Sequence, residues 1–283
     1  MKNLFLVLIG ILAFPAMLYA ADGNADAAAN ANAIRGGWVA DVGGRTQVYM
    51  LIVRGDVVTG TYCAECTDPR NLGYIDGRLD AAGVHFVVRH EYKVGKVTLD
   101  DVRGTLKGKE LVLSVQPRQA AAHPVTVTLR RPPPVPPVPI LTNDEAELPG
   151  LVHGSRPAYV PPGPPEPLNA DKVLGLWLWG TGPGKQYFVI QRVGTHLLGM
   201  VCGPCDNPNA MAPLDGFVIE GTGLKFNIVH EDTGAAVQRG PFNNVAHATL
   251  TRNEMHIKVI PSFEPPTSRP IEMTLLGPVV FQR

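Results

Sequence analysis

A seven-residue stretch of this sequence occurs twice: GTYCAEC at residues 60–66 returns as GMVCGPC at residues 199–205. In both copies a tryptophan, Trp38 or Trp177, stands twenty-five residues before the first cysteine. Other identities follow at a nearly constant offset, among them Gln47/Gln186, Gly55/Gly194, Phe86/Phe226, His90/His230, Glu91/Glu231 and Thr105/Thr249. So many matches over this length indicate a tandem duplication.

Each copy consists of short runs of residues that favour β-strands. Runs such as 47–54, 57–62 and 84–92 are rich in Val, Ile, Tyr and Phe, and turns that contain glycine or aspartate separate them. About eight such runs fit into each copy, and an up-and-down meander of that size closes most simply as an eight-stranded barrel. The sequence therefore predicts an all-β protein made of two tandem antiparallel meander barrels. Such a barrel has room for packed side chains or for one small ligand.

The first residues differ in composition from the repeats. Residues 1–20 combine Lys2, an apolar run and small residues at the end, which is typical of a secretory signal peptide. A membrane anchor is the alternative, but the run is short for a span and Pro15 interrupts it. Residues 21–33, rich in Ala, Asn and Asp, predict a flexible leader. We therefore expect a periplasmic or secreted protein with no membrane span in the mature chain.

Proline separates the two repeats. Residues 132–170 are rich in proline, which fixes φ and lacks a backbone N–H, so this stretch cannot join a sheet. It predicts a semi-rigid linker between repeat 1 at residues 34–131 and repeat 2 at residues 171–283. The alternative is a linker that packs along one of the barrels.

Charge and motifs exclude several classes of function. The formal charge is zero, with 25 basic and 25 acidic residues scattered along the chain, whereas nucleic-acid binding usually shows as clustered Lys and Arg. We expect neither nucleic acid nor an anionic membrane surface as a partner. Motifs of serine hydrolases and zinc proteases do not occur, and the glycine-rich stretch 180–185 lacks the spacing of a phosphate-binding loop. Outward Arg89, Glu91 and Lys93 on one strand exclude a lipid-facing barrel.

The two Cys-x-x-Cys pairs occupy equivalent places in the repeats. Paired cysteines in an exported chain usually form disulfides, and of three connectivities we favour Cys63–Cys66 with Cys202–Cys205. A metal site shared by the four sulfurs is a minority alternative, and no cofactor is predicted. Redox exchange is a further alternative, because Cys-Gly-Pro-Cys occurs in thioredoxin-like proteins. There the first cysteine opens a helix, whereas here it ends a strand.

A histidine near the end of a strand is the second repeated feature. Alternate residues of a strand share a face, so His90 and His230 should point into the barrels while Glu91 and Glu231 point outward. The inward faces also hold Val84, Phe86, Val88 and Tyr92 in repeat 1 and Leu224, Phe226, Ile228 and Asp232 in repeat 2. One interpretation is a core histidine satisfied by a neighbour, because an unsatisfied polar group costs about 1–3 kcal/mol. The other is a pocket histidine that binds a ligand or transfers protons.

The start of each repeat resembles the entrance of avidin-type and lipocalin-type barrels. The resemblance rests on an early tryptophan near a glycine, then a strand, then the stretch TGTY at residues 59–62. It implies that Trp38 and Trp177 close the barrel floors and that Tyr62 lines a ligand site. Repeat 2 has Val201 in place of that tyrosine, and neither repeat has avidin's later tryptophan-containing strands. Biotin binding is therefore not implied.

These patterns lead to one expected function and two alternatives. We expect an exported protein that binds a small, largely apolar or amphipathic ligand in one or both barrels. The candidate ligand-binding residues are Trp38, Tyr62, Phe86, His90, Tyr92, Trp177, Phe226, His230 and Asp232. The first alternative is a lyase, isomerase or hydrolase with His90 or His230 as general acid or base. The second is a module for contact with proteins or a cell surface.

Overall fold

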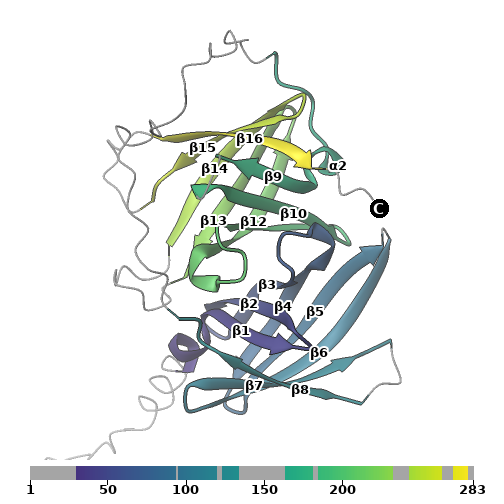
Figure 1. The fold of residues 1–283 in the computed structure, drawn as a ribbon, viewed down its shortest axis with the longest axis vertical. Helices are drawn as coiled ribbons and strands as arrows, with labels where there is room; N and C mark the ends of the chain where they lie inside the picture. Colours follow the sequence, from purple (N-terminus) through teal and green to yellow (C-terminus); the bar gives the residue numbers. More distant parts are fainter. Residues whose placement is uncertain are drawn as a thin grey trace, which may run out of the picture.

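The computed structural model describes residues 30–93, 95–119, 123–133, 163–180, 184–231, 242–262 and 270–279. Within these ranges the chain forms two closed antiparallel barrels of eight strands each (Figure 1). The predicted all-β fold of two tandem meander barrels is therefore confirmed. The predicted signal peptide, most of the predicted leader and the middle of the predicted linker lie outside the described residues.

In the first barrel every strand pairs with the next one, and the last returns to the first. A short 3-10 turn, η1 (Pro69–Asn71), connects the third strand to the fourth. Closure comes from Val39 opposite Arg130. The strands are β1 (Gly36–Val42), β2 (Arg45–Arg54), β3 (Val57–Ala64), β4 (Leu72–Asp80), β5 (Gly83–Lys93), β6 (Lys96–Lys107), β7 (Glu110–Pro117) and β8 (Val125–Arg130).

The second barrel repeats this order after a short helix, α2 (Ala170–Val173), and its last strand pairs with its first. The turn η3 (Pro208–Ala210) takes the place of η1. The helical segments among the described residues are too short to span a bilayer. The strands are β9 (Gly175–Trp179), β10 (Gln186–Val193), β11 (His196–Cys202), β12 (Met211–Glu220), β13 (Gly223–His230), β14 (Phe242–Thr251), β15 (Glu254–Ile260) and β16 (Ile271–Val279).

A helical turn and a tryptophan close one end of each barrel. The Trp38 indole N–H donates to the carbonyl of Ile34, within the helical residues 30–34, at 2.7 Å. Trp177 makes the same bond to Val173 of α2 at 3.0 Å. In barrel 1 the guanidinium carbon of Arg131 lies 3.9 Å from the centroid of the Trp38 ring. The last residues of the predicted leader are therefore part of the closed end of barrel 1.

Apolar side chains fill the interior of both barrels. Phe86 is 1% exposed and Phe226 is fully buried, and both belong to contiguous cores around their tryptophans. Close packing of this kind is typical of protein interiors. The core of barrel 1 includes Trp38, Tyr49, Leu51, Val58, Ile75, Phe86, Val102, Leu113 and Leu129. The core of barrel 2 includes Trp177, Phe188, Ile190, Leu214, Phe226, Ala246, Ile257 and Leu275.

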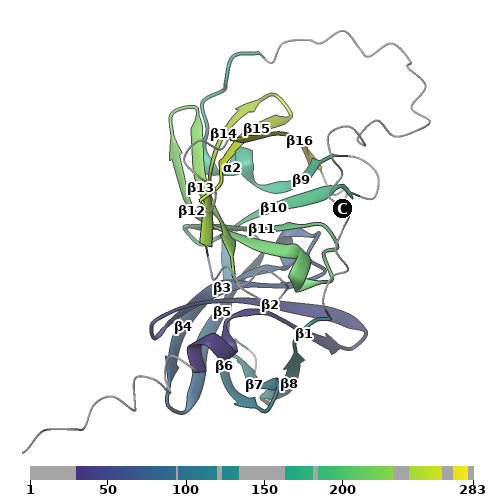
Figure 2. The same cartoon turned by 90° about the vertical axis from the view of Figure 1, so that its left-hand side faces the viewer.

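A third hydrophobic cluster, the inter-barrel cluster, joins the two barrels where β1–β4 face β9–β12 (Figure 2). Gly37 of β1 approaches η3 so closely that a Cβ atom there would overlap Pro208. One pair of contacts repeats in reverse, because η3 lies against β2 and η1 lies against the equivalent strand β10. Equivalent strands and turns of the two barrels therefore face each other. The cluster includes Val39, Val48, Met50, Cys63 and Leu72 of barrel 1 and Val189, Leu198, Met200, Cys202 and Met211 of barrel 2.

Candidate functional site

His90 lies inside barrel 1 near its open end, where β5 approaches the loop to β6. Its side chain is only 3% exposed, and its Nε2 atom lies 3.2 Å from Oδ2 of Asp100 on β6. The ring of Tyr62 on β3 is nearly perpendicular to the imidazole, at a centroid distance of 5.2 Å. Tyr49 of β2 packs against Tyr62, with the two ring centroids 4.8 Å apart. The Asp100 side chain is 26% exposed, so the carboxylate reaches solvent while the imidazole does not.

Barrel 2 has the same arrangement with an amide in place of the carboxylate. Nε2 of His230 lies 3.3 Å from Nδ2 of Asn244 on β14. The Asn244 Oδ1 atom accepts the backbone N–H of Ser262 at 3.0 Å. Phe242 stacks on the His230 ring at a centroid distance of 4.6 Å.

Asp100 and Asn244 are equivalent positions of the duplication. In the strand registers Val88 faces Asp100, and Ile228, which matches Val88, faces Asn244. Sequence reasoning missed both partners. Counting five residues back from the matched pair Thr105/Thr249 would have aligned them, but only the strand pairing shows that each lies beside its histidine.

The two pairs differ in the direction of their hydrogen bonds. An ionised carboxylate only accepts, so Nε2 of His90 carries a proton and donates to Asp100. The Ser262 N–H fixes the amide of Asn244 with its oxygen toward Ser262, and Nδ2 therefore donates to Nε2 of His230. Neutral His230 must then hold its proton on Nδ1. Burial lowers the pKa of His230, which faces an uncharged partner.

Most of the other predicted site residues do not lie beside the histidines. Tyr62, partly buried, lies beside His90. The side chain of Tyr92 and the whole of Asp232 lie outside the described part of the structure. The remaining four, none more than 1% exposed, lie in the cores and at the closed ends: Trp38, Phe86, Trp177 and Phe226.

No protein-family model, curated protein or solved structure matches this chain. What the two histidine pairs do must therefore be inferred from their geometry.

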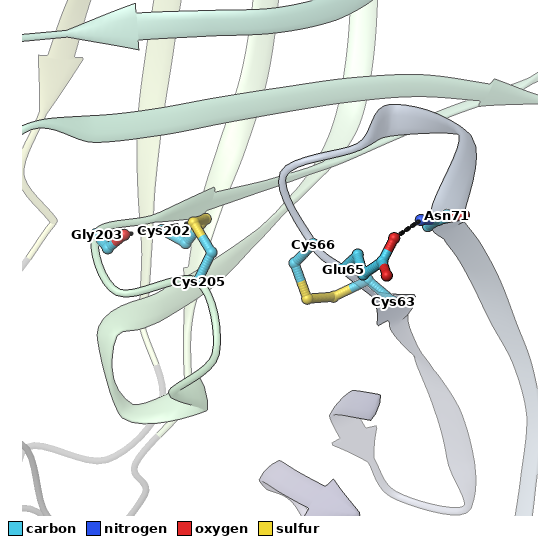
Figure 3. The surroundings of a disulfide bond; sticks show 7 residues. All are labelled: Cys63, Glu65, Cys66, Asn71, Cys202, Gly203 and Cys205. Carbon is cyan, nitrogen blue, oxygen red and sulfur yellow. Dashed lines mark hydrogen bonds between the residues drawn. A yellow bond between two sulfur atoms is a disulfide. The ribbon is translucent and has the colours of Figure 1, made fainter. Parts of the chain in front are cut away.

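The cysteines form the disulfides expected from the sequence. Cys63–Cys66 and Cys202–Cys205 each join Cα atoms 5.1 Å apart, and no cysteine is free (Figure 3). Each bridge ties the end of a strand, β3 or β11, to the loop that leads into η1 or η3. Cys63 and Cys202 are almost completely buried in the inter-barrel cluster. The disulfides therefore shape the two loops through which the barrels contact each other.

Glu91 and Glu231 point away from their own barrels, as expected, but the neighbouring barrel covers both. Glu91 accepts the backbone N–H of Gly95 at 2.8 Å and that of Gly194, in the β10–β11 turn, at 2.6 Å. Glu231, whose side chain is 1% exposed, lies 2.8 Å from the guanidinium of Arg54, at the matching β2–β3 turn. Burial raises the pKa of Glu231, and Arg54 opposes part of that rise.

Proposed function

We propose that this is an exported binding protein that holds a small amphipathic ligand at the open end of barrel 1. The observation that carries the proposal is the His90–Asp100 pair, whose geometry recurs as His230–Asn244. Small-molecule sites typically combine apolar walls with a few placed polar groups. Here a polar pair lies at the top of an otherwise apolar interior, and one member reaches solvent.

The packing limits where such a ligand can lie. Phe86 and Trp38 fill the barrel below the pair, so the ligand lies above the core and not deep in the barrel. Its polar group is a hydrogen-bond donor, because the accessible Asp100 carboxylate accepts. Its apolar body packs against Tyr62, which the interior leaves partly exposed.

Export is the second part of the proposal. Disulfides persist in oxidising compartments, and both Cys-x-x-Cys pairs are disulfides. Together with the signal-like residues 1–20, they support a periplasmic or secreted protein.

Native mass spectrometry of protein exported to a periplasm and purified without reductant tests the binding proposal. We expect a discrete mass above that of the oxidised mature chain in the wild type, and its loss in Asp100→Asn. That variant copies the amide of barrel 2, so the fold should tolerate it, and Asn244→Asp is the matched control that should keep the mass. A wild type that stays bare when offered periplasmic and medium extracts would contradict ligand binding and support the protein-contact alternative.

Acid–base catalysis at the same pair is a second candidate. Asp100 accepts from Nε2 of His90 and orients the imidazole, which is the arrangement of a general base with its carboxylate. If extracts contain a substrate, mass spectrometry should show its depletion by the wild type. His90→Gln should abolish that depletion while His230→Gln preserves it, with both variants folded by circular dichroism.

A further inference from the structure

A groove with a volume of about 1080 Å³ runs along the outer face of β12–β16, where exposed side chains such as Lys225, His247 and Lys258 line it. Gly163 and Pro165, at the end of the linker, form one edge of it. The Thr251 hydroxyl donates to the Gly163 carbonyl at 3.4 Å, and Glu166 N–H donates to the carbonyl of Leu250 at 2.9 Å, which hold that edge in place.

Three basic side chains form a row across neighbouring strands in this groove. Lys225 of β13 faces His247 of β14, and His247 faces Lys258 of β15. Directly opposite residues in antiparallel strands have Cβ atoms about 4.5–5.5 Å apart, and like charges in that position destabilise a sheet. Lys225 and Lys258 each lie opposite the same histidine, so like charges adjoin across the strands whenever His247 is protonated.

The chain neutralises this row only in part. Glu272 of β16 lies directly opposite Lys258, and Glu220 also lines the groove, but among the described residues neither Lys225 nor Lys258 comes within ion-pair distance of a carboxylate. The nearby His256 is occupied, with Nδ1 3.2 Å from the Thr274 hydroxyl and Nε2 3.3 Å from Glu254. Local arrangements that do not favour the fold are often found at functional sites.

Barrel 1 has a smaller groove of about 520 Å³ at the equivalent place. There His85 faces Arg103, and Arg103 faces Ser114. The first two positions of the row are thus basic in both barrels, whereas the third is a serine in barrel 1 and Lys258 in barrel 2. Both repeats have kept the basic pair, and barrel 2 has the stronger version.

We propose that the groove of barrel 2 binds a ligand that bears an oxyanion, such as a carboxylate, sulfate or phosphate. The anion lies over His247 between Lys225 and Lys258, and the Thr249 hydroxyl, which also lines the groove, donates to it. The site is separate from the pocket proposed in barrel 1, so either can fail without the other.

Calorimetric titration of the full chain with citrate, pyrophosphate and a sulfated disaccharide tests the proposal and distinguishes the three oxyanions. The test variant is Lys225→Ala/Lys258→Ala, and the control of equal charge is Lys107→Ala/Lys109→Ala, on the exposed β6–β7 turn. We expect at least one anion to bind the wild type and the control equally, and the test variant about tenfold or more weakly.

Thermal unfolding without ligand separates binding from stability. The variant removes the like charges of the row but also the lysine that faces Glu272, so it should be about as stable as the wild type. The proposal is overturned if no anion binds the wild type at millimolar concentration, or if both variants weaken binding equally. It is also overturned if the test variant melts well below the control.

Discussion

The two histidine pairs are the same site in two barrels that have diverged. His90 with Asp100 and His230 with Asn244 occupy equivalent positions, are held at almost the same distance and lie above equivalent cores. Asp and Asn differ only in whether one terminal group is an oxygen or an NH2. That difference reverses the hydrogen bond, moves the histidine proton and decides whether the imidazole has a charged partner. Duplication has therefore kept the scaffold while the chemistry of the two pairs has diverged.

Substitutions at the closed ends test whether the two tryptophans contribute equally to stability. Trp38→Ala and Trp177→Ala each leave a large cavity and should cost about 3–5 kcal/mol of unfolding free energy. Trp38→Ala should be the more damaging, because it also removes the ring against which the guanidinium of Arg131 packs. That guanidinium is largely buried, and burial lowers its pKa to about 10. Urea unfolding measures both variants. Equal losses would show that the Arg131 contact adds nothing to the closed end.

Much of this architecture could be predicted from sequence because the duplication repeats it. Strand runs, glycine turns and cysteine spacing are local, and they led to two barrels and two short-range disulfides that the structure confirms. Alternation along β5 also showed which way His90 and Glu91 point. Alternation cannot show that a second barrel covers an outward face, so the burial of Glu91 was not predicted.

Contacts between strands explain what else was missed. Asp100 becomes a partner of His90 only when the register of β5 and β6 is known. Lys225, His247 and Lys258 are far apart in the chain, so their charges are scattered in sequence and adjacent in the sheet. The histidine pairs and the basic row both depend on tertiary register, which composition and periodicity do not determine.

The two interface glutamates should respond in opposite ways to neutralisation. Glu91→Gln weakens two hydrogen bonds to backbone N–H groups and should cost about 1.5–3 kcal/mol, since the acceptor loses its charge. Glu231→Gln should instead stabilise the protein at neutral pH, by up to about 1 kcal/mol, because a buried charge is removed while the half-exposed Arg54 stays solvated.

The pH dependence of the Glu231 effect follows from its pKa. Because that pKa is raised in the folded state, the folded protein takes up a proton more readily than the unfolded chain. The wild type therefore gains stability relative to Glu231→Gln as the pH falls through the folded pKa, and the two converge in acid. Urea midpoints at several pH values measure this. A Glu231→Gln variant that is less stable than wild type at neutral pH would show that the Arg54 pair outweighs the cost of burial.

Exchanging the partners of the two histidines is the most direct test of the comparison. The pKa of His230 is lowered by burial, so the unfolded chain binds a proton more readily than the folded protein. The contribution of His230 to stability should therefore decline as the pH falls below about 6.5, the ordinary histidine pKa. Asn244→Asp places a carboxylate beside His230, raises its pKa and should remove most of that decline, an effect of about 1.4 kcal/mol per pKa unit restored.

Histidine ring signals followed by NMR assign the change to the right residue. In Asn244→Asp the His230 titration should move to higher pH, while the His90 signals stay unchanged. The experiment is best performed in the Glu231→Gln background. Protonation of Glu231 stabilises the folded protein in acid and would mask the stability lost through His230. If His230 titrates as in the wild type despite the new carboxylate, position 244 does not control its protonation. The divergence of the two barrels would then have another origin, such as Phe242, which stacks on the His230 ring, whereas the Tyr62 ring is perpendicular to that of His90.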